Sequence, residues 1–276
     1  MNGNRYLCKF FYIGKNYYGS QRQLNHITIE KCIINALMKK KYIIDVRNSG
    51  FEVASRTDRY VSARGAAFSF IAKKNPILME INSVLPKDIG IWAKTGVPQD
   101  FSSRFNAVCR HYKYLFPIYS NDSNINLDIM RKACKDLVGR HDFTNFSKKD
   151  IEEVVALRDL TIARFEKHEH FLIFDFKSRA FLRQQIRRMM TKIIELGRNQ
   201  TSYDDFLLLF DSSKEFSYRP ADANGLILWD VDYGQNLRFE IDKKSVERMK
   251  TFLLKSLEKF DLKSRLFHIM EQDDLS

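Results

Sequence analysis

Arg56, Thr57 and Asp58 are the residues of this chain with the clearest capacity for chemistry, and they follow an apolar run at residues 50–54. That run is typical of a β-strand, so Asp58 is expected to leave a sheet edge beside a guanidinium. The sheet can desolvate the carboxylate and the arginine favours its charged form, which suits a nucleophile or a base. An ordinary turn is the alternative, since Asp and Thr are frequent in turns and helix caps.

Six segments spread over most of the chain carry recognisable motifs: GKNYYGSQRQ at residues 14–23, SRTDRYVSA at 55–63, FNA at 105–107, RHYKY at 110–114, GRHDFTNF at 139–146 and PADANGL at 220–226. In this order they resemble the pseudouridine synthases of the tRNA pseudouridine synthase A (TruA) family. Ordered matches at sensible separations are hard to produce by chance. The chain is therefore identified as a member of this family.

The resemblance implies an isomerase that converts uridine to pseudouridine at positions 38, 39 and/or 40 in the anticodon stem-loop of tRNAs. It also implies an α+β pseudouridine synthase fold, a homodimer and no cofactor. The reaction breaks the N1 glycosidic bond, rotates the base and rejoins it through C5. The base cannot react inside a stacked stem, so it must be flipped into a pocket.

The resemblance also assigns roles to four residues of the site. Asp58 would be the catalytic carboxylate, and Arg187, which ends FLRQQIR at residues 181–187, would pair with it. This ion pair would hold the carboxylate in place, keep it charged and join the two units of the chain. Arg56 would displace the target base from its stack or hold a phosphate. Tyr112 would form the floor of the base pocket and assist proton transfer at C5, although a core tyrosine on an alternating strand is the alternative.

Further RNA contacts are expected from the first loop, from the residue after Asp58 and from a basic helix. The candidates are Gln21, Arg22, Gln23, Arg59, Arg183 and Arg188. Residues 177–198 carry seven Lys and Arg against Glu195 alone, an imbalance that favours phosphate. At 100° per residue, Arg183 and Arg187 lie along the edge of an apolar stripe, while Arg188 and Lys192 face away. The alternatives are a polar loop and a solvated basic face.

Three departures from the family pattern bear on target choice. Ile13 stands where Asp is usual, Ser20 where an aromatic residue is usual, and Tyr60 where Gly is usual. Tyr60 could restrict a loop that Gly would leave free. A pseudouridine synthase for another tRNA or RNA site is therefore the main alternative, and a non-catalytic RNA-binding protein on the same fold is a further one.

Composition agrees with an RNA partner without selecting it. The 276 residues carry a formal net charge of +12 with a pI near 9.4, and RNA, DNA and an acidic membrane surface all fit that charge. Residues 1–5 lack the apolar core of a secretory signal and no long apolar run occurs, so a cytoplasmic location is expected. The four cysteines are far apart, and His168 and His170 are expected in a turn, so no metal site is predicted.

The elements that must position these residues are expected in two α/β units, at residues 1–100 and 101–276, with a mixed, mainly antiparallel sheet flanked by helices. Strands are predicted at 6–12, 51–55, 66–72, 90–97, 110–118, 156–165, 171–178 and 226–231. Helices are predicted at 28–40, 75–84, 127–138, from 181, 203–210 and 244–260. The apolar stripe of the last helix, from Val246 to Phe260, is typical of packing within one chain.

Overall fold

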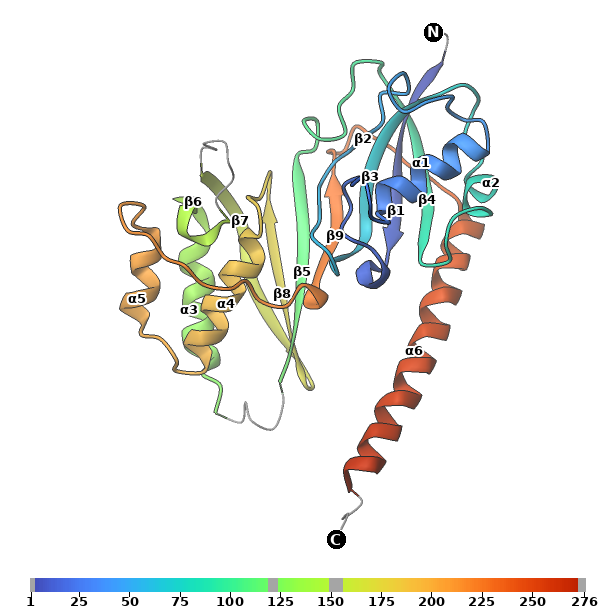
Figure 1. Cartoon of the computed structure of the whole chain (residues 1–276). Helices are drawn as coiled ribbons and strands as arrows, with labels where there is room; N and C mark the ends of the chain where they lie inside the picture. Colours follow the sequence, from blue (N-terminus) through green and yellow to red (C-terminus); the bar gives the residue numbers. More distant parts are fainter. Residues whose placement is uncertain (1–2, 119–123, 149–155, 273–276) are drawn as a thin grey trace.

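The computed structural model describes residues 3–118, 124–148 and 156–272, and its strands form one continuous sheet with helices against it (Figure 1). The strand order is β10-β4-β1-β3-β9-β5-β8-β7-β6, and β2 pairs with β3 beside this path. Among the described strands, β3 and β9 pair in parallel and the other pairs are antiparallel. The predicted α+β fold with a mixed, mainly antiparallel sheet is confirmed.

The first half of the sheet consists of aromatic and aliphatic strands covered by two helices. Its elements are β1 (Asn4–Tyr12), β2 (Glu52–Val53), β3 (Ser62–Ala72), β4 (Ile89–Val97), α1 (Ile29–Lys39) and α2 (Leu78–Asn82). Thr28 caps α1 as predicted, because its side chain accepts a hydrogen bond from the backbone N–H of Lys31 at 3.4 Å.

The second half places the helices α3, α4 and α5 on one side of the sheet (Figure 1). Its elements are β5 (Cys109–Pro117), α3 (Leu127–Leu137), β6 (Gly139–Asp142), β7 (Leu157–His168), β8 (Phe171–Ser178), α4 (Gln185–Gly197), α5 (Tyr203–Leu207) and β9 (Leu226–Asp232). Along β5 the buried residues alternate with half-buried ones, so Arg110, Tyr112, Tyr114 and Phe116 share the inner face.

The end of the chain returns to the first half. The short strand β10 (Glu240–Ile241) pairs with β4, and α6 (Lys243–Gln272) packs its first turns on β4 and α2. The Phe252 ring lies 6.3 Å from that of Phe11, and beyond it α6 extends past the sheet (Figure 1), with Nζ of Lys15 5.6 Å from the centre of the Phe260 ring. The last helix thus packs on the first half of the sheet, and the division into units at residues 1–100 and 101–276 stays a prediction. No helix in the described ranges is long and apolar enough to cross a membrane.

Several predicted elements differ from the structure for local reasons. The helix predicted from Phe181 begins at Gln185, because Gln184 has a left-handed φ of 59°. The second predicted helix spans only Leu78–Asn82, and the last helix continues to Gln272. The strands β6 and β10 were not predicted, since so few residues carry little periodicity. His168 and His170 lie at the hairpin turn between β7 and β8, as predicted.

Candidate active site

Asp58 and Arg187 form an ion pair between the two halves of the sheet. The Oδ2 atom of Asp58 lies 2.7 Å from Nη1 of Arg187, which is on the first turn of α4. The Nε atom of Arg187 donates a second hydrogen bond, at 2.8 Å, to the carbonyl of Ala221. The guanidinium is thus fixed from two sides, and it orients a carboxylate whose side chain is still 31% exposed.

The first loop of the chain holds the backbone beside Asp58. The backbone N–H of Thr57 donates to Oγ of Ser20 at 2.8 Å, and the N–H of Ser20 donates to the carbonyl of Thr57 at 3.1 Å. Tyr12 shares a hydrogen bond of 2.7 Å with the hydroxyl of Thr57. Ser20 is buried, so its small hydroxyl fits where an aromatic ring would not without moving the loop.

Gly19 allows this close approach of the two loops. Its φ is +88°, a conformation that side chains rarely adopt, and a Cβ there would lie 2.9 Å from the carbonyl oxygen of Thr57. The chain therefore requires glycine at this position. The loop of residues 17–28 and the loop of residues 56–60 behave as one packed unit.

Arg110 supports the site from below, a role that the sequence analysis did not assign. Its guanidinium donates to the carbonyls of Ala54 and Arg104, to Oγ of Ser55 and to the carbonyl of Arg179. It is only 7% exposed. The sequence does contain a sign of this role: Arg110 falls on the inward face of an alternating strand, and a buried charged side chain must find hydrogen-bond partners.

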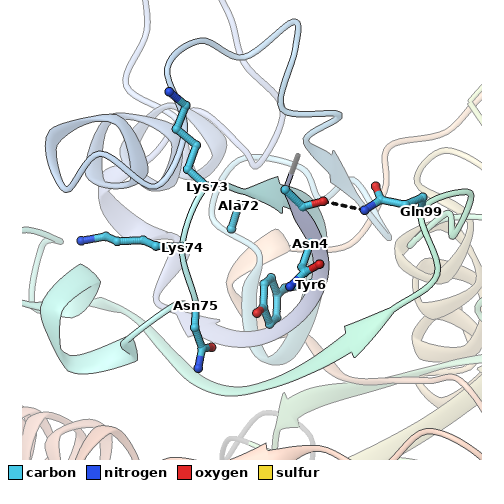
Figure 2. A pocket seen from close by; sticks show the side chains of 8 residues that line it. Asn4, Tyr6, Ala72, Lys73, Lys74, Asn75 and Gln99 are labelled. Atoms are coloured by element: carbon cyan, nitrogen blue, oxygen red, sulfur yellow. Dashed lines mark hydrogen bonds between the residues drawn. The ribbon is translucent and has the colours of Figure 1, made fainter. Parts of the chain in front are cut away.

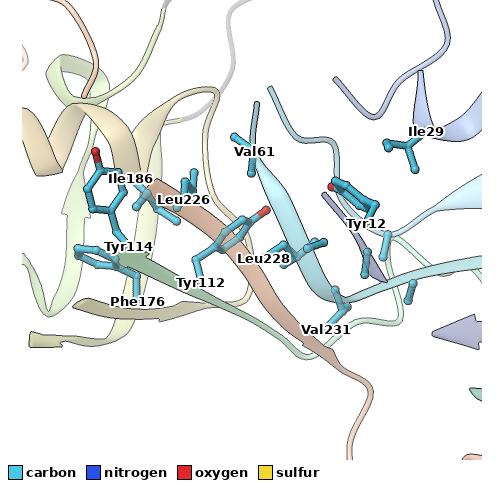
Figure 3. Packing of buried hydrophobic residues seen from close by; sticks show 14 of the residues in the cluster. Tyr12, Ile29, Val61, Tyr112, Tyr114, Phe176, Ile186, Leu226, Leu228 and Val231 are labelled. Atoms are coloured by element: carbon cyan, nitrogen blue, oxygen red, sulfur yellow. The ribbon is translucent and has the colours of Figure 1, made fainter. Parts of the chain in front are cut away.

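Tyr112 lies beside the ion pair, on the inner face of β5. It pairs with Leu228 across β5 and β9 (Figure 3). Its ring packs edge-on against that of Phe181, with the ring centroids 5.3 Å apart. Burial raises the pKa of Tyr112 to about 12, and the negative charge of Asp58 acts in the same direction. Tyr112 is thus part of the core, and its role at the target base stays a prediction.

The sequence of the chain matches those of known tRNA pseudouridine synthases. The model of a tRNA pseudouridine synthase family matches residues 133–234. The chain is 33% identical to tRNA pseudouridine synthase A of Archaeoglobus fulgidus over 273 residues, which cover 99% of each chain. The chain belongs to the tRNA pseudouridine synthase A family. The enzymes of this name from Methanosphaera stadtmanae and Thermococcus sibiricus are each 34% identical to it, over 91% and 95% of the chain and 92% and 97% of their own lengths.

Solved structures give a weaker likeness. A chain in the crystal structure of a Cbf5-Nop10-Gar1 complex aligns with a TM-score of 0.36 and 11% identity, over 68% of this chain and 53% of that one. At this TM-score and identity, the likeness says nothing about the site. The family assignment depends on the full-length relatives, which make this chain a tRNA pseudouridine synthase, an isomerase.

Most of the residues predicted to contact RNA lie on the two loops at the rim of the candidate site. Arg56 and Arg59 are exposed on either side of the half-buried residues Thr57 and Asp58, and Gln21 is exposed after Ser20. Two of the loop candidates have partners within the protein. Arg22 pairs with Glu30 at 3.3 Å, and the side chain of Gln23 donates to the carbonyl of Tyr18 at 2.6 Å.

The two arginines predicted on the basic helix differ in their surroundings. Arg183 is exposed and precedes α4. The prediction that Arg188 faces away from the protein is wrong, because it is 8% exposed and donates to the carbonyl of Tyr218 at 2.9 Å. Its guanidinium also lies 4.1 Å from the centre of the Tyr218 ring. As a substrate contact Arg188 stays a prediction, but within the protein it fastens the segment before β9 to α4.

The hollow in Figure 2 is remote from this synthase site. Its volume is about 570 Å³, and its lining includes Asn4, Ala72, Lys73 and Gln99. Asn4 and Ala72 pair at one end of β1 and β3, whereas Tyr12, at the other end of β1, contacts Thr57. Eight residues of strand separate the two ends, roughly 26 Å at the usual rise.

Proposed function

We propose that this chain converts uridine to pseudouridine in the anticodon stem-loop of tRNAs, at positions 38, 39 and/or 40, with Asp58 as the catalytic carboxylate. The observation that supports this most is the ion pair between Asp58 and Arg187 in a member of the tRNA pseudouridine synthase A family. A protein that only bound RNA would have no need to hold a half-exposed carboxylate in one orientation at an RNA-facing loop.

Asp58 can act by three routes, and each needs its ionised carboxylate. It can attack C6 of the uracil, attack C1′ of the ribose, or remove a ribose proton to give a glycal intermediate. In every case the N1–C1′ bond breaks, the base turns, and C5 replaces N1 on C1′; C5 loses its proton to water and N1 takes up a proton. Arg187 keeps the carboxylate facing the reacting nucleotide in all three routes.

Tyr112 and Arg56 are proposed to place the nucleotide. Tyr112 is buried beside Asp58, where burial raises its pKa to about 12. It is proposed to pack against the base and to assist proton transfer at C5. Arg56 is exposed close to Asp58. It is proposed to fill the space in the stem that the flipped base vacates, or to bind a neighbouring phosphate.

The RNA is proposed to lie over the two loops at the site and the basic helix, on a chain with a net charge of +12. The contacts are assigned to Gln21, Arg22, Gln23, Arg59, Arg183 and Arg188.

We also propose a homodimer and a cytoplasmic location. Large apolar side chains remain exposed on the projecting part of α6, including Leu254, Leu257, Phe260 and Phe267. An exposed apolar surface of this extent supports the proposal that a second copy of the chain packs against it.

A different target site in tRNA or another RNA is the alternative, and Ser20 and Tyr60 in the loops at the site favour it. Mapping decides between the two. Unmodified tRNA transcripts are incubated with the enzyme, treated with a carbodiimide that stays on pseudouridine, and read by primer extension. Stops at positions 38, 39 or 40 support the proposal, and stops only elsewhere establish the alternative.

A further inference from the structure

Four side chains beside Asp58 form a continuous stack at the rim of the site. The rings of Tyr18 and His26 are stacked, with centroids 4.1 Å apart and planes 14° apart. The guanidinium of Arg59 lies 4.1 Å from the centre of the Tyr18 ring and 4.5 Å from the centre of the Tyr60 ring. We call Tyr18, His26, Arg59 and Tyr60 the stacking platform.

The stacking platform is exposed and yet fixed in position. The Tyr18 side chain belongs to a residue that is 40% exposed, and His26 and Arg59 are exposed too. The backbone N–H of Tyr18 donates to the carbonyl of Ile27 at 3.0 Å, which closes the loop that carries both rings. Because Gly19 packs on the backbone of residues 57–59, the platform cannot move independently of Asp58.

Tyr60 has a backbone conformation that points to a function for its ring. Its φ is +71°, which is unfavourable for a residue with a bulky side chain. Strain of this kind persists where the surrounding structure holds it, and it is concentrated at functional sites. The ring packs partly against the core and supports Arg59 from its other side.

The charge of Arg59 is directed to the surface. Within the ranges that the structure describes, Arg59 makes no ion pair with an acidic side chain. A guanidinium that lies over aromatic rings keeps its N–H groups at its edge, where a phosphate can accept them.

We propose that the stacking platform binds the nucleotide next to the flipped uridine, with a base stacked on the outer face of the His26 ring, at the end of the stack, and Arg59 on its phosphate. This inference rests on the proposed function and names a substrate contact within it. When a uridine leaves the stack, its neighbour loses a stacking partner, and an aromatic face at the rim replaces it. The platform would thereby select how the RNA lies across the site.

The test measures RNA binding in the Asp58→Asn background, where turnover does not interfere. A labelled anticodon stem-loop is prepared intact and with an abasic nucleotide on either side of the target uridine. Replacing His26 by alanine is expected to weaken binding of the intact RNA about tenfold. With the abasic RNA that lacks the stacked base, the parent and His26→Ala should bind equally weakly. His26→Phe, which keeps a flat ring, should retain the affinity of the parent.

The outcomes separate this proposal from the reaction. Equal binding of intact RNA by the parent and His26→Ala, or the same loss with both abasic RNAs, would overturn the stacking proposal even if the wild type forms pseudouridine. The expected loss with one abasic RNA would support it even if the wild type forms none. Absence of binding to every RNA tested would overturn it as well.

Discussion

At the scale of single residues, Asp58 depends on side chains that are far from it in sequence. Arg187 orients the carboxylate, while Ser20 and Tyr12 hold Thr57 next to it. Ser20 accepts a hydrogen bond from a backbone N–H in a buried position. Losing such a hydrogen bond is costly, because the backbone N–H is then left without any hydrogen-bond partner.

Replacing Ser20 by alanine is expected to lower the free energy of unfolding by about 2 kcal/mol, since the N–H of Thr57 is left without a partner. Turnover should also fall, because the backbone beside Asp58 loosens. Urea denaturation and pseudouridine formation measure the two effects. Ser83→Ala is the matched control, since Ser83 is exposed and bonds only within its own turn, to the carbonyl of Glu80. A Ser20→Ala variant as stable and active as the wild type would contradict this account of the loop.

The pairing of Asp58 with Arg187 could be predicted from the sequence, but the residues that hold the backbone around this pair could not. Asp58 and Arg187 each lie in a segment that resembles the family, so their meeting was an expectation before the structure. Arg110 and Ser20 act through backbone groups of other segments, and no pattern in the chain states which carbonyl or N–H will lie nearby. The stack of Tyr18 and His26 on Arg59 likewise depends on a loop conformation that only the folded chain has.

At the scale of elements, β5 underlies the site, because its buried inner face carries Arg110 and Tyr112. Burial raises the pKa of both Tyr112 and Tyr114 to about 12. The period of two along this strand was readable from the sequence, and the strand was predicted almost to its ends. The two residues of β2 were predicted as a longer strand, since the turn that follows it is set by contacts with Arg110 and Ser20 rather than by local propensity.

The raised pKa values predict a loss of stability at alkaline pH. The folded state favours the neutral tyrosines, so their contribution is complete below about pH 10, the ordinary tyrosine value. It is lost as the pH rises from about 10 towards 12. The Tm should fall over this range, and tyrosinate absorbance at 295 nm from these residues should appear only with unfolding. Tyr114→Phe should reduce the slope of Tm against pH. Ionisation of all tyrosines near pH 10 without unfolding would contradict the burial of this strand.

At the scale of the whole molecule, one sheet passes through both halves and the final helix leaves it. Residues 243–252 of α6 pack on the first half, while Leu257 and Phe260 beyond them are 65% and 54% exposed. The apolar stripe of this helix was interpreted as core from its periodicity. Periodicity shows which face is apolar but not whether the same chain covers it.

If a second copy covers this face, replacing Leu257 and Phe260 together by glutamine should convert a dimer into a monomer. The fold of each subunit should survive, because both side chains are exposed. A cooperative thermal unfolding transition of the monomeric variant would show that it is folded. Light scattering coupled to size exclusion gives the mass. Ile44→Gln, a change of another exposed apolar residue, is the control and should remain dimeric. A wild type that is monomeric, or a doubly substituted protein that is still dimeric, would contradict this use of α6.

The central claim is that Asp58 forms pseudouridine, and tritium release from RNA tests it most directly. The wild type and Asp58→Asn are incubated with a tRNA transcript that carries tritium at C5 of every uridine, and the tritium in water is counted. Only bond formation at C5 frees the label. We expect release by the wild type and a rate at least about a thousandfold lower for Asp58→Asn, which corresponds to about 4 kcal/mol in the barrier. Near-normal release by Asp58→Asn would contradict the assignment of Asp58 as the catalytic residue.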